Sequence, residues 1–444
     1  MKPYSPRLAA LRGLAALERG EVHRLRVGVE MRNLNTSDRA LAWELAQGTE
    51  RMHLCLDFVL TRFVDRHLPS EPLLLSALRL GAYQLMFLTR MPARAAVHET
   101  VDLLKHGRGF ANAVLRRLSS QIVVRTADPE QTGRELALPG ESETPRCLVF
   151  PDDVLPSPDT PAFSAVRHGL PEHVVERWWT THGPQVCEEI CAASSEPPGV
   201  VLRATDRIPA GRSLIDVLEV EGVTLAPLTH PRLFRLLRGP AFATDAFAEG
   251  FFVAQDPTAT AAGEALGAQA GETVLDLCAA PGTKTTQLAE AVGESGRVLA
   301  YDIDPLRRAR VRENVDRLGH RARVTILEDL EGVEDVDRVL VDVPCSNTGV
   351  LARRVEVRRR LRPGFSGLLA ETQHSLLRQA LDLCREGGTV VYSTCSLEPE
   401  ENHQIVDQVL LTTPQRSGQI LRDRLTLPRP DKGDGGYFAV LQLA

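Results

Sequence analysis

In the first 125 residues of the 444-residue chain, hydrophobic positions recur at the spacing of α-helices. Residues 73–88 are almost entirely apolar, which predicts a central buried helix. An amphipathic stripe follows at positions i, i+3, i+4 and i+7, formed by Val97, Thr100, Val101 and Leu104. Gly107 is expected to end that helix. The segment 5–125 is therefore predicted to be all-helical.

The pattern changes at Gly239, after which short runs rich in β-branched residues alternate with helical segments. Strands and helices in this order predict a mainly parallel sheet with helices on both faces, a Rossmann-like α/β fold. The final run GGYFAVLQLA is expected to add an antiparallel strand. The predicted strands are 273–277, 297–304, 323–328, 337–345 and 389–396, and the predicted helices are 305–318 and 368–384.

Two shorter regions separate these parts. Residues 127–161 are rich in Pro, Gly, Ser and acidic residues, which is typical of a linker. A helical segment and the strand-like runs VVLRAT and GVTLAPL follow, which predict a small α+β module. The predicted organisation is thus multidomain: a helical domain at 1–125, an acidic linker at 126–165, a small α+β module at 166–238 and a Rossmann-like α/β domain at 239–444.

Charge is unevenly distributed along the chain. The net charge is −6, which argues against a general polyanion binder. However, residues 1–125 contain 19 Lys and Arg residues against 11 Asp and Glu residues, and residues 126–170 contain 3 against 8. A basic N-terminal region suggests contact with RNA phosphates, and a solvated helical surface explains the same charge equally well.

Several classes of protein are not indicated by the sequence. No apolar run is long enough to cross a bilayer and the N-terminus lacks a signal-peptide core, so a cytoplasmic location is expected.

The eight cysteines show no paired CxxC spacing, and no metal site is expected. Cys187 and Cys191 are expected to pack in a core. The pair Trp178-Trp179 either stacks on bases or packs, and packing is favoured.

The stretch Thr273–Glu290 reads as a strand, a tight glycine turn and a helix. Such a turn directs backbone N–H groups and a helix N-terminus at a nucleotide-like cofactor, although a purely structural turn has the same pattern. Asp302 follows the turn by about 20 residues, where a carboxylate accepts hydrogen bonds from ribose hydroxyls. The turn AAPGTK is not GxGxxG, which favours S-adenosylmethionine (SAM) over NAD. Asp329 is expected either to meet the adenine edge or to cap its loop.

Two cysteines, Cys345 and Cys395, end adjacent predicted strands. Either cysteine alone is most simply a small buried hydrophobic residue. Together, beside Asp342 at the carboxyl edge of the sheet, they suggest covalent catalysis on a pyrimidine. Addition of a thiolate to carbon 6 makes carbon 5 nucleophilic towards a methyl donor, and a carboxylic acid at N3 assists.

These motifs carry a resemblance to a known family. DLCAAPGTKT, DVPCSNTGVLARR and VVYSTCSLEPEEN resemble the RNA 5-methylcytosine methyltransferases of the RsmB/Sun/NSUN family. The segment AVHETVDLLKHGRGFANAVLRRL resembles the end of a NusB-type helical RNA-binding domain, which accompanies the methyltransferase domain in the RsmB/Sun branch. The resemblance implies a SAM-dependent enzyme that methylates carbon 5 of a cytosine in 16S ribosomal RNA.

The resemblance also implies roles for individual residues. Cys395 is the nucleophile, Cys345 assists product release, and Asp342 contacts the cytosine and lies near the methionine part of SAM. Asp302 and Asp329 are the ribose and adenine contacts. The cofactor loop consists of Cys278, Ala279, Ala280, Pro281, Gly282, Thr283 and Lys284.

This chain departs from the family pattern at three places. Thr283 replaces the second glycine of the usual APGGK, and a β-branched residue is strained there if the position needs a positive φ. Asn347 replaces a glycine, a milder change because Asn tolerates left-handed backbone. The usual His-Pro is absent after an Arg pair, and a basic cluster follows that is expected to contact phosphate or to form a solvated helix face: Arg353, Arg354, Arg358, Arg359 and Arg360.

Two competing functions remain open at this point. One is a non-catalytic NusB-like RNA-binding or ribosome-assembly factor with a degenerate methyltransferase domain. The change at Thr283 keeps this alternative open, and the presence of Asp302, Asp342, Cys345 and Cys395 argues against it. The other is an NAD-dependent oxidoreductase, against which the missing GxGxxG and the two edge cysteines argue. The sequence favours the SAM-dependent methyltransferase, with ribosomal RNA as partner and a monomeric state.

Overall fold

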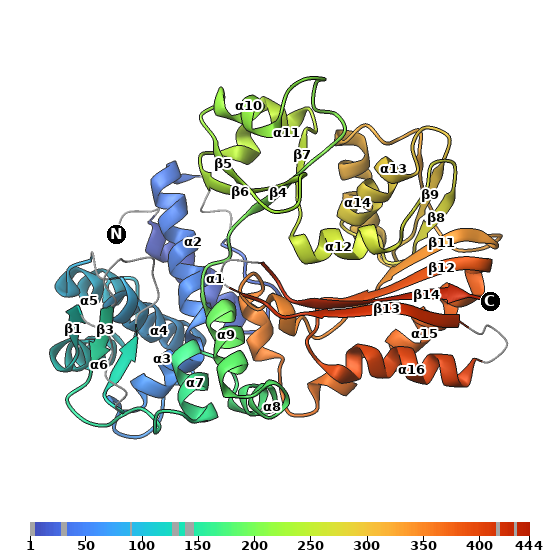
Figure 1. Ribbon diagram of the computed structural model, residues 1–444. Coiled ribbons are helices and arrows are strands. Elements are labelled where there is room, and N and C mark those ends of the chain that lie inside the picture. The colour runs from blue at the N-terminus through green and yellow to red at the C-terminus, as the bar shows by residue number, and fades with distance from the viewer. Residues whose placement is uncertain are drawn as a thin grey trace. The chain divides into compact units, whose positions relative to one another are not determined.

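The computed structural model describes residues 5–27, 33–88, 91–126, 133–137, 146–413, 418–429 and 433–444. The chain forms two compact units (Figure 1). Unit 1 comprises Met1–Pro197 and Leu351–Pro363, and unit 2 comprises Pro198–Val350 and Gly364–Ala444. Among the described helices, none combines the length and the apolar character that a bilayer crossing needs.

Unit 1 begins with six helices, which confirms the helical prediction for this region. The apolar segment forms α4, whose residues from Leu75 to Gln84 are all buried. Gly107 does not end a helix as expected; its left-handed backbone, with φ 75°, precedes α6. The helices are α1 (Pro6–Glu18), α2 (Thr36–Arg51), α3 (His53–Leu60), α4 (Pro72–Phe87), α5 (Ala93–Val101) and α6 (Arg108–Gln121).

The predicted linker is partly a structured element. It contributes β2 (Glu135–Ala137) and β3 (Arg146–Val149) to the antiparallel sheet β1-β3-β2. The remaining strand, β1 (Val123–Thr126), begins within the segment predicted to be all-helical, so that prediction was wrong for its last residues. Leu136, Leu148 and Phe150 from this region are buried in the hydrophobic core of unit 1. Because these apolar residues pack in a core, this region is more ordered than its Pro- and Gly-rich composition had indicated. Residues 127–132 and 138–145 lie outside the described residues.

Three more helices complete the N-terminal part of unit 1: α7 (Pro161–His168), α8 (Glu172–His182) and α9 (Pro184–Ser195). They belong to unit 1, whereas the strands predicted to share a module with them belong to unit 2. The predicted module 166–238 is therefore divided between the two units. Unit 1 also takes up Leu351–Pro363, which includes the short helix η4 (Val355–Arg359), and Val355 is fully buried in its core.

Unit 2 contains a seven-stranded sheet with the order β10-β9-β8-β11-β12-β14-β13. The neighbours from β10 to β12 are parallel, and β14 pairs antiparallel with β12 and β13, as expected for the final strand. The strands are β8 (Thr273–Asp276), β9 (Arg297–Ala300), β10 (Val324–Ile326), β11 (Val336–Asp342), β12 (Cys384–Thr394), β13 (Gly418–Thr426) and β14 (Gly436–Leu443).

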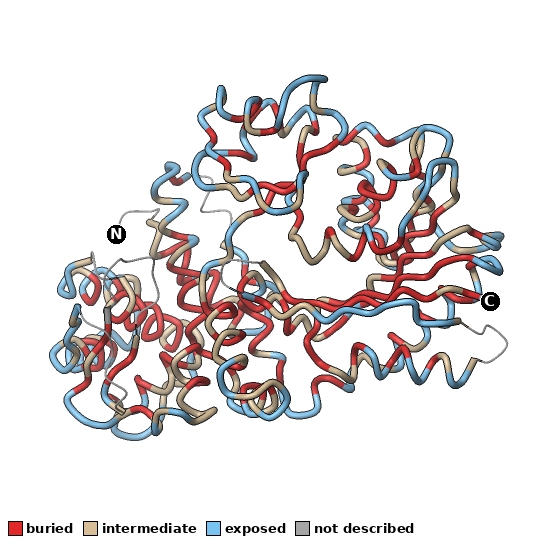
Figure 2. Tube along the Cα trace, in the orientation of Figure 1, coloured by how far each residue is buried: buried red, intermediate tan, exposed pale blue. Residues whose placement is uncertain are grey.

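Helices cover both faces of this sheet, and each face has its own hydrophobic core (Figure 1). Because side chains alternate along a strand, Val339 and Val341 of β11 enter one core and Leu340 enters the other. The central strands are buried and the edge strand β13 is exposed (Figure 2). The helices are α12 (Pro257–Ala265), α13 (Thr283–Ala291) and α14 (Pro305–Arg317) on one face, and α15 (Ala370–Leu383) and α16 (His403–Thr412) on the other.

A smaller antiparallel sheet, β5-β6-β4-β7, precedes the large one in unit 2. Its last strand lies beyond residue 238, so the predicted boundary cuts through this module. Buried Arg203 of β4 pairs with Glu290 of α13 at 2.7 Å and so ties the module to the large sheet. The elements are β4 (Val201–Ala204), α10 (Leu214–Glu219), β5 (Thr224–Pro227), β6 (Leu233–Arg238), η2 (Ala241–Ala243), α11 (Asp245–Ala248) and β7 (Phe252–Ala254).

Candidate active site

The predicted cofactor loop follows β8 at the carboxyl edge of the sheet. The strand order reverses beside β8, and ligands of open α/β sheets bind at such a point. Gly282 has φ 103° and precedes α13, and a Cβ on it would lie 3.1 Å from Val311 Cα. Thr283 is the first residue of that helix and is not among the described residues with positive φ. The strain considered for Thr283 therefore does not arise.

Asp302 lies just beyond β9 and is 2% exposed. One carboxylate oxygen accepts a hydrogen bond from Ala280 N at 3.2 Å, and the other accepts from Asp304 N at 3.1 Å. Asp302 thus connects the cofactor loop to the end of the second strand. Ile303 and Leu306, which follow it in the chain, are each 81% exposed.

Asp329 lies beyond β10 and is exposed. Its carboxylate accepts a hydrogen bond from Glu331 N at 3.0 Å, which is the loop-cap arrangement. The adenine contact stays a prediction for this residue.

Asp276, at the end of β8, is a buried carboxyl group that the sequence had not singled out. Thr285 donates a hydrogen bond to it at 2.7 Å. Burial raises the pKa of Asp276 to about 7, against the lowering effect of the Thr285 hydrogen bond. In the folded protein this carboxyl group therefore keeps its proton to a higher pH than an ordinary aspartic acid does.

The raised pKa predicts a pH dependence of stability. Between about pH 4 and about pH 7 the folded state binds a proton at Asp276 that the unfolded state has lost, so wild-type stability falls as pH rises through this window. Asp276→Asn cannot ionise and still accepts from Thr285. We expect its free energy of unfolding, relative to wild type, to increase by on the order of 4 kcal/mol across the window and then level off. Urea unfolding at a series of pH values tests this, and a constant difference would contradict it.

The two predicted catalytic cysteines meet at the ends of β11 and β12. These strands are parallel neighbours in which Asp342 pairs with Ser393, so Cys345 and Cys395 follow at the same edge. Their sulfur atoms lie 3.2 Å apart. Cys345 is buried and Cys395 is half-buried. The hydrogen bond with Cys395, together with burial, raises the pKa of the Cys345 thiol well above its ordinary value.

Asp342 and Lys284, predicted for different parts of the site, form an ion pair. Lys284 Nζ lies 2.6 Å from one Asp342 oxygen, and Ser393 Oγ donates to the other at 2.7 Å. Burial lowers the pKa of Lys284, but the Asp342 carboxylate outweighs it and the net shift is upward. The cofactor loop and the catalytic edge are thus electrostatically connected, with a cation and a carboxylate beside the two thiols.

Buried hydroxyl and carboxyl groups hold the two cysteine loops together. Glu401 is fully buried and accepts hydrogen bonds from Ser346 N at 2.8 Å and from Ser346 Oγ at 2.5 Å. Asn402 accepts from Thr394 Oγ1 at 2.6 Å. Gly349 N donates to Cys395 O at 2.9 Å, and a Cβ on Gly349 would lie 2.5 Å from the Gly435 carbonyl oxygen. These contacts fix the loops before any ligand binds.

Asn347 has a left-handed backbone, with φ 66°, as its residue type allows. Its side chain contacts both cysteines: the amide nitrogen donates to Cys345 O at 2.5 Å, and the amide oxygen accepts from Cys395 Sγ at 3.4 Å. The sequence had marked Asn347 only as a mild departure in the backbone. Its contact with the sulfur depends on how two loops, 48 residues apart in sequence, face each other.

The basic cluster belongs to unit 1, and two of its members do not fit a phosphate-contact role. Arg358 is 2% exposed and donates to the carbonyls of Gly169 at 3.1 Å and Ser194 at 2.6 Å. Arg359 pairs with the fully buried Glu50 at 2.5 Å. Both side chains instead anchor Leu351–Pro363 in unit 1, which corrects the prediction for them. Arg353 is half-buried, and Arg354 and Arg360 are exposed.

The Arg359–Glu50 pair predicts a large effect on stability. Arg359→Met leaves Glu50 buried without its cation, so we expect the free energy of unfolding to fall by about 3–5 kcal/mol. Urea unfolding of the full chain measures this. The double variant Arg359→Met/Glu50→Gln is the matched control, because it removes the orphaned charge and should recover part of the loss. A change below about 1 kcal/mol in the single variant would contradict the assignment.

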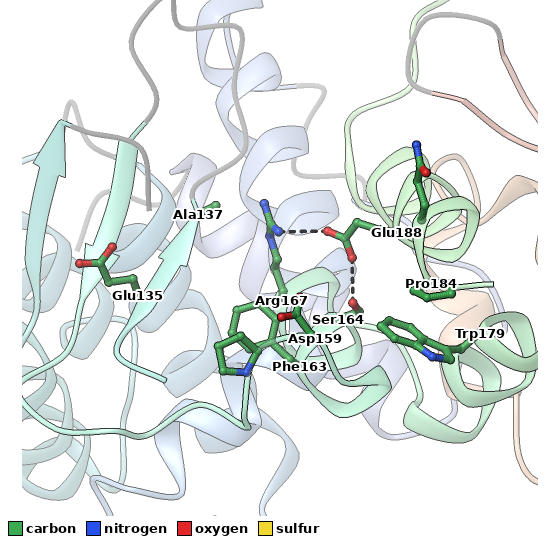
Figure 3. A pocket seen from close by; sticks show the side chains of 11 residues that line it. Glu135, Ala137, Asp159, Phe163, Ser164, Arg167, Trp179, Pro184 and Glu188 are labelled. Atoms are coloured by element: carbon green, nitrogen blue, oxygen red, sulfur yellow. Dashed lines mark hydrogen bonds and ion pairs between the residues drawn. The ribbon is translucent and has the colours of Figure 1, made fainter. Parts of the chain in front are cut away.

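Unit 1 contains a cavity of about 270 Å³, and none of the residues that line it is a predicted catalytic residue. Trp179 and Phe163 line it, whereas Trp178 is 1% exposed and packs in the core, as favoured. Ser164 and Arg167 both donate to Glu188, at 2.7 and 3.0 Å (Figure 3). Because these polar groups are hydrogen-bonded to one another, we assign no ligand to the cavity and no base-stacking role to Trp179.

An open sheet with this order, helices on both faces and a cofactor loop after β8 is the fold of SAM-dependent methyltransferases. The family model described as 16S rRNA methyltransferase RsmB/F matches residues 264–441, and the NusB family model matches residues 5–120. Among the described residues, no group of three His, Cys, Asp or Glu side chains is arranged to hold a metal ion.

Individual relatives match most of the chain. It is 31% identical over 423 residues to the probable ribosomal RNA small subunit methyltransferase B of Bacillus subtilis, covering 91% of this chain and 88% of that protein. It is 31% identical over 428 residues to ribosomal RNA small subunit methyltransferase B of Klebsiella pneumoniae, covering 92% and 91%. A methyltransferase homolog protein from Pyrococcus horikoshii aligns with a TM-score of 0.55 at 25% identity, covering 63% of this chain and 97% of that one. The chain therefore belongs to the 16S rRNA methyltransferase RsmB/F family.

Proposed function

We propose that this protein transfers a methyl group from SAM to carbon 5 of a cytosine in 16S ribosomal RNA, through a covalent bond between Cys395 and carbon 6. The observation that carries the proposal is the pair of thiols 3.2 Å apart at the ends of adjacent strands, beside Asp342. Neither an NAD oxidoreductase nor a purely RNA-binding factor accounts for two thiols and a Lys–Asp pair at this edge.

The residues at the carboxyl edge fit SAM. The left-handed glycine turn at Gly282 places the cofactor loop directly before the N-terminus of α13, and the exposed apolar side chains of Ile303 and Leu306 offer a surface that a purine ring would cover. Asp302 is the proposed ribose contact, Asp329 the proposed adenine contact, and Cys278 to Lys284 the proposed cofactor loop. When bound, SAM supplies an electrophilic methyl group on a sulfonium sulfur. The strain at Thr283 that had kept a degenerate domain open as an alternative is absent.

In the proposed addition, the Cys395 sulfur bonds to carbon 6 of the cytosine. The thiol proton passes through Asp342 to ring N3, where the electrons of the carbon 5–carbon 6 double bond place negative charge. Lys284 keeps Asp342 beside the thiols while this proton moves. Carbon 5 then carries enough electron density to attack the methyl group.

In the proposed release, the bond between carbon 6 and Cys395 breaks and the carbon 5 proton leaves. Cys345 passes its own proton to the departing Cys395 sulfur and takes the carbon 5 proton in its place. The N3 proton leaves through Asp342, so methyl replaces one proton overall. A thiol with a raised pKa, hydrogen-bonded to Cys395, suits this exchange.

For RNA contact we propose the exposed Arg354 and Arg360, with Arg353 as a third phosphate contact, and a monomer as the acting species. A paired target cytosine would first have to leave its helix.

The test of the proposed function is methyl transfer from labelled SAM to unmethylated 16S rRNA, with base-resolution mapping of the product. The expected result is 5-methylcytosine at a defined position. Methylation at another atom or on another base would overturn the reaction class. Binding of both RNA and SAM without any incorporation would favour the assembly-factor function.

A further inference from the structure

Asn347 closes a ring of contacts around the two thiols. Cys345 and Cys395 are in hydrogen-bonding contact, Cys395 Sγ donates to the Asn347 amide oxygen at 3.4 Å, and the Asn347 amide nitrogen returns to Cys345 O at 2.5 Å. The last contact fixes the orientation of the amide, because a carbonyl oxygen accepts only from the NH₂ group. The amide oxygen is thereby held against the Cys395 sulfur.

We propose that Asn347 is a further catalytic residue, which holds Cys395 in its thiol form until substrate arrives. The proposal rests on the proposed function, in which Cys395 is the nucleophile. Its physical basis is that an amide oxygen accepts a hydrogen bond from a thiol and repels a thiolate. A hydrogen bond to the neutral form of an acid disfavours the charged form.

The resting enzyme would gain protection from this contact. A thiolate is the form that reacts with oxidants and electrophiles, and a half-buried Cys395 is within their reach. The thiol proton would be surrendered when a cytosine enters and Asp342 accepts it. The other charged and titratable groups that act on the two thiols are Cys345, Glu401 and the Lys284–Asp342 pair, and they are unchanged in the variants below.

The experiment measures iodoacetamide labelling of Cys395 in the full-length protein without RNA or SAM, from about pH 6 to about pH 10. Peptide mass spectrometry reports Cys395, with Cys278 in the same digest as an internal reference. Asn347→Gly removes the amide and suits the left-handed backbone. We expect it to label about 3- to 10-fold faster near neutral pH, corresponding to one hydrogen bond, with the difference vanishing at high pH.

Two further variants keep the result interpretable. Asn347→Asp places a carboxylate against the sulfur and is expected to label more slowly than wild type near neutral pH. Asp335→Gly is the matched control, because it places glycine at another position with left-handed backbone, φ 52°. It should leave Cys395 labelling unchanged. Opposite effects of Gly and Asp at position 347 support the inference.

An unchanged or slower rate in Asn347→Gly would overturn the inference. An equal increase in the rate of Cys395 labelling at every pH would also overturn the inference, since it would report easier access of the reagent and not a larger thiolate fraction. Labelling does not require methyl transfer, so failure here is distinguishable from failure of the proposed function, which the Cys395→Ala variant tests separately.

Discussion

Cys395→Ala is expected to abolish methyl transfer, with a loss of about 10³-fold or more in kcat, while SAM binding is kept. The side chain supplies the only bond through which carbon 5 of a cytosine is activated in the proposed reaction, so its removal eliminates the pathway and does not merely weaken a contact. SAM binding should persist because the proposed cofactor contacts lie on the loop after β8 and beside Asp302. Single-turnover methylation and a SAM titration measure the two effects.

The matched control for this variant is Cys187→Ala. Cys187 is also a cysteine, is buried in α9 of unit 1 and has no part in the proposed chemistry. It should methylate at the wild-type rate. Turnover of Cys395→Ala within tenfold of wild type would remove Cys395 from the mechanism and leave Cys345 as the candidate nucleophile.

Cys345→Ala is expected to accumulate a protein–RNA adduct that survives denaturing gels. The variant retains Cys395 and Asp342, so the addition and the methyl transfer proceed. It lacks the thiol that exchanges protons with Cys395 at 3.2 Å, so the bond to carbon 6 breaks slowly. The shifted band should carry labelled methyl groups and should form in proportion to both RNA and SAM.

The double variant Cys345→Ala/Cys395→Ala separates this adduct from nonspecific crosslinking and should give no band. Normal turnover in Cys345→Ala without an adduct would exclude Cys345 from release. An adduct that persists in the double variant would exclude Cys395 as the attached residue.

The sequence predicted the five parallel strands of the large sheet because runs rich in β-branched residues alternate there with turns and helical segments. It missed the edge strand β13, whose exposed residues do not form such a run. The carboxyl ends of parallel strands meet at one edge, so Asp302, Asp342, Cys345 and Cys395 were placed near a common site from their positions in the strands alone. The antiparallel β14 was likewise expected from the end of the chain.

Contacts between distant segments were not predictable in this way. Lys284 and Asp342 are 58 residues apart, and Glu401 reaches Ser346 across 55 residues. No local pattern encodes such pairs, so the ion pair, the buried network and the Asn347–Cys395 contact emerged only from the structure. The phosphate-contact prediction was wrong for Arg358 and Arg359 for the same reason. A run of charges resembles a solvated surface until the buried partner is known, which for Arg359 is Glu50.

The proposed role of Cys395 as the nucleophile is tested by identifying the residue that attaches to the RNA. The wild-type protein is incubated with SAM and 16S rRNA containing 5-fluorocytidine, whose carbon 5 carries fluorine in place of the proton that must leave, so that the adduct persists after methyl transfer. Digestion and tandem mass spectrometry then locate the modified peptide. The proposed mechanism predicts a methylated fluoropyrimidine bonded to Cys395. Attachment to Cys345, or a methylated RNA product without any covalent adduct, would contradict it.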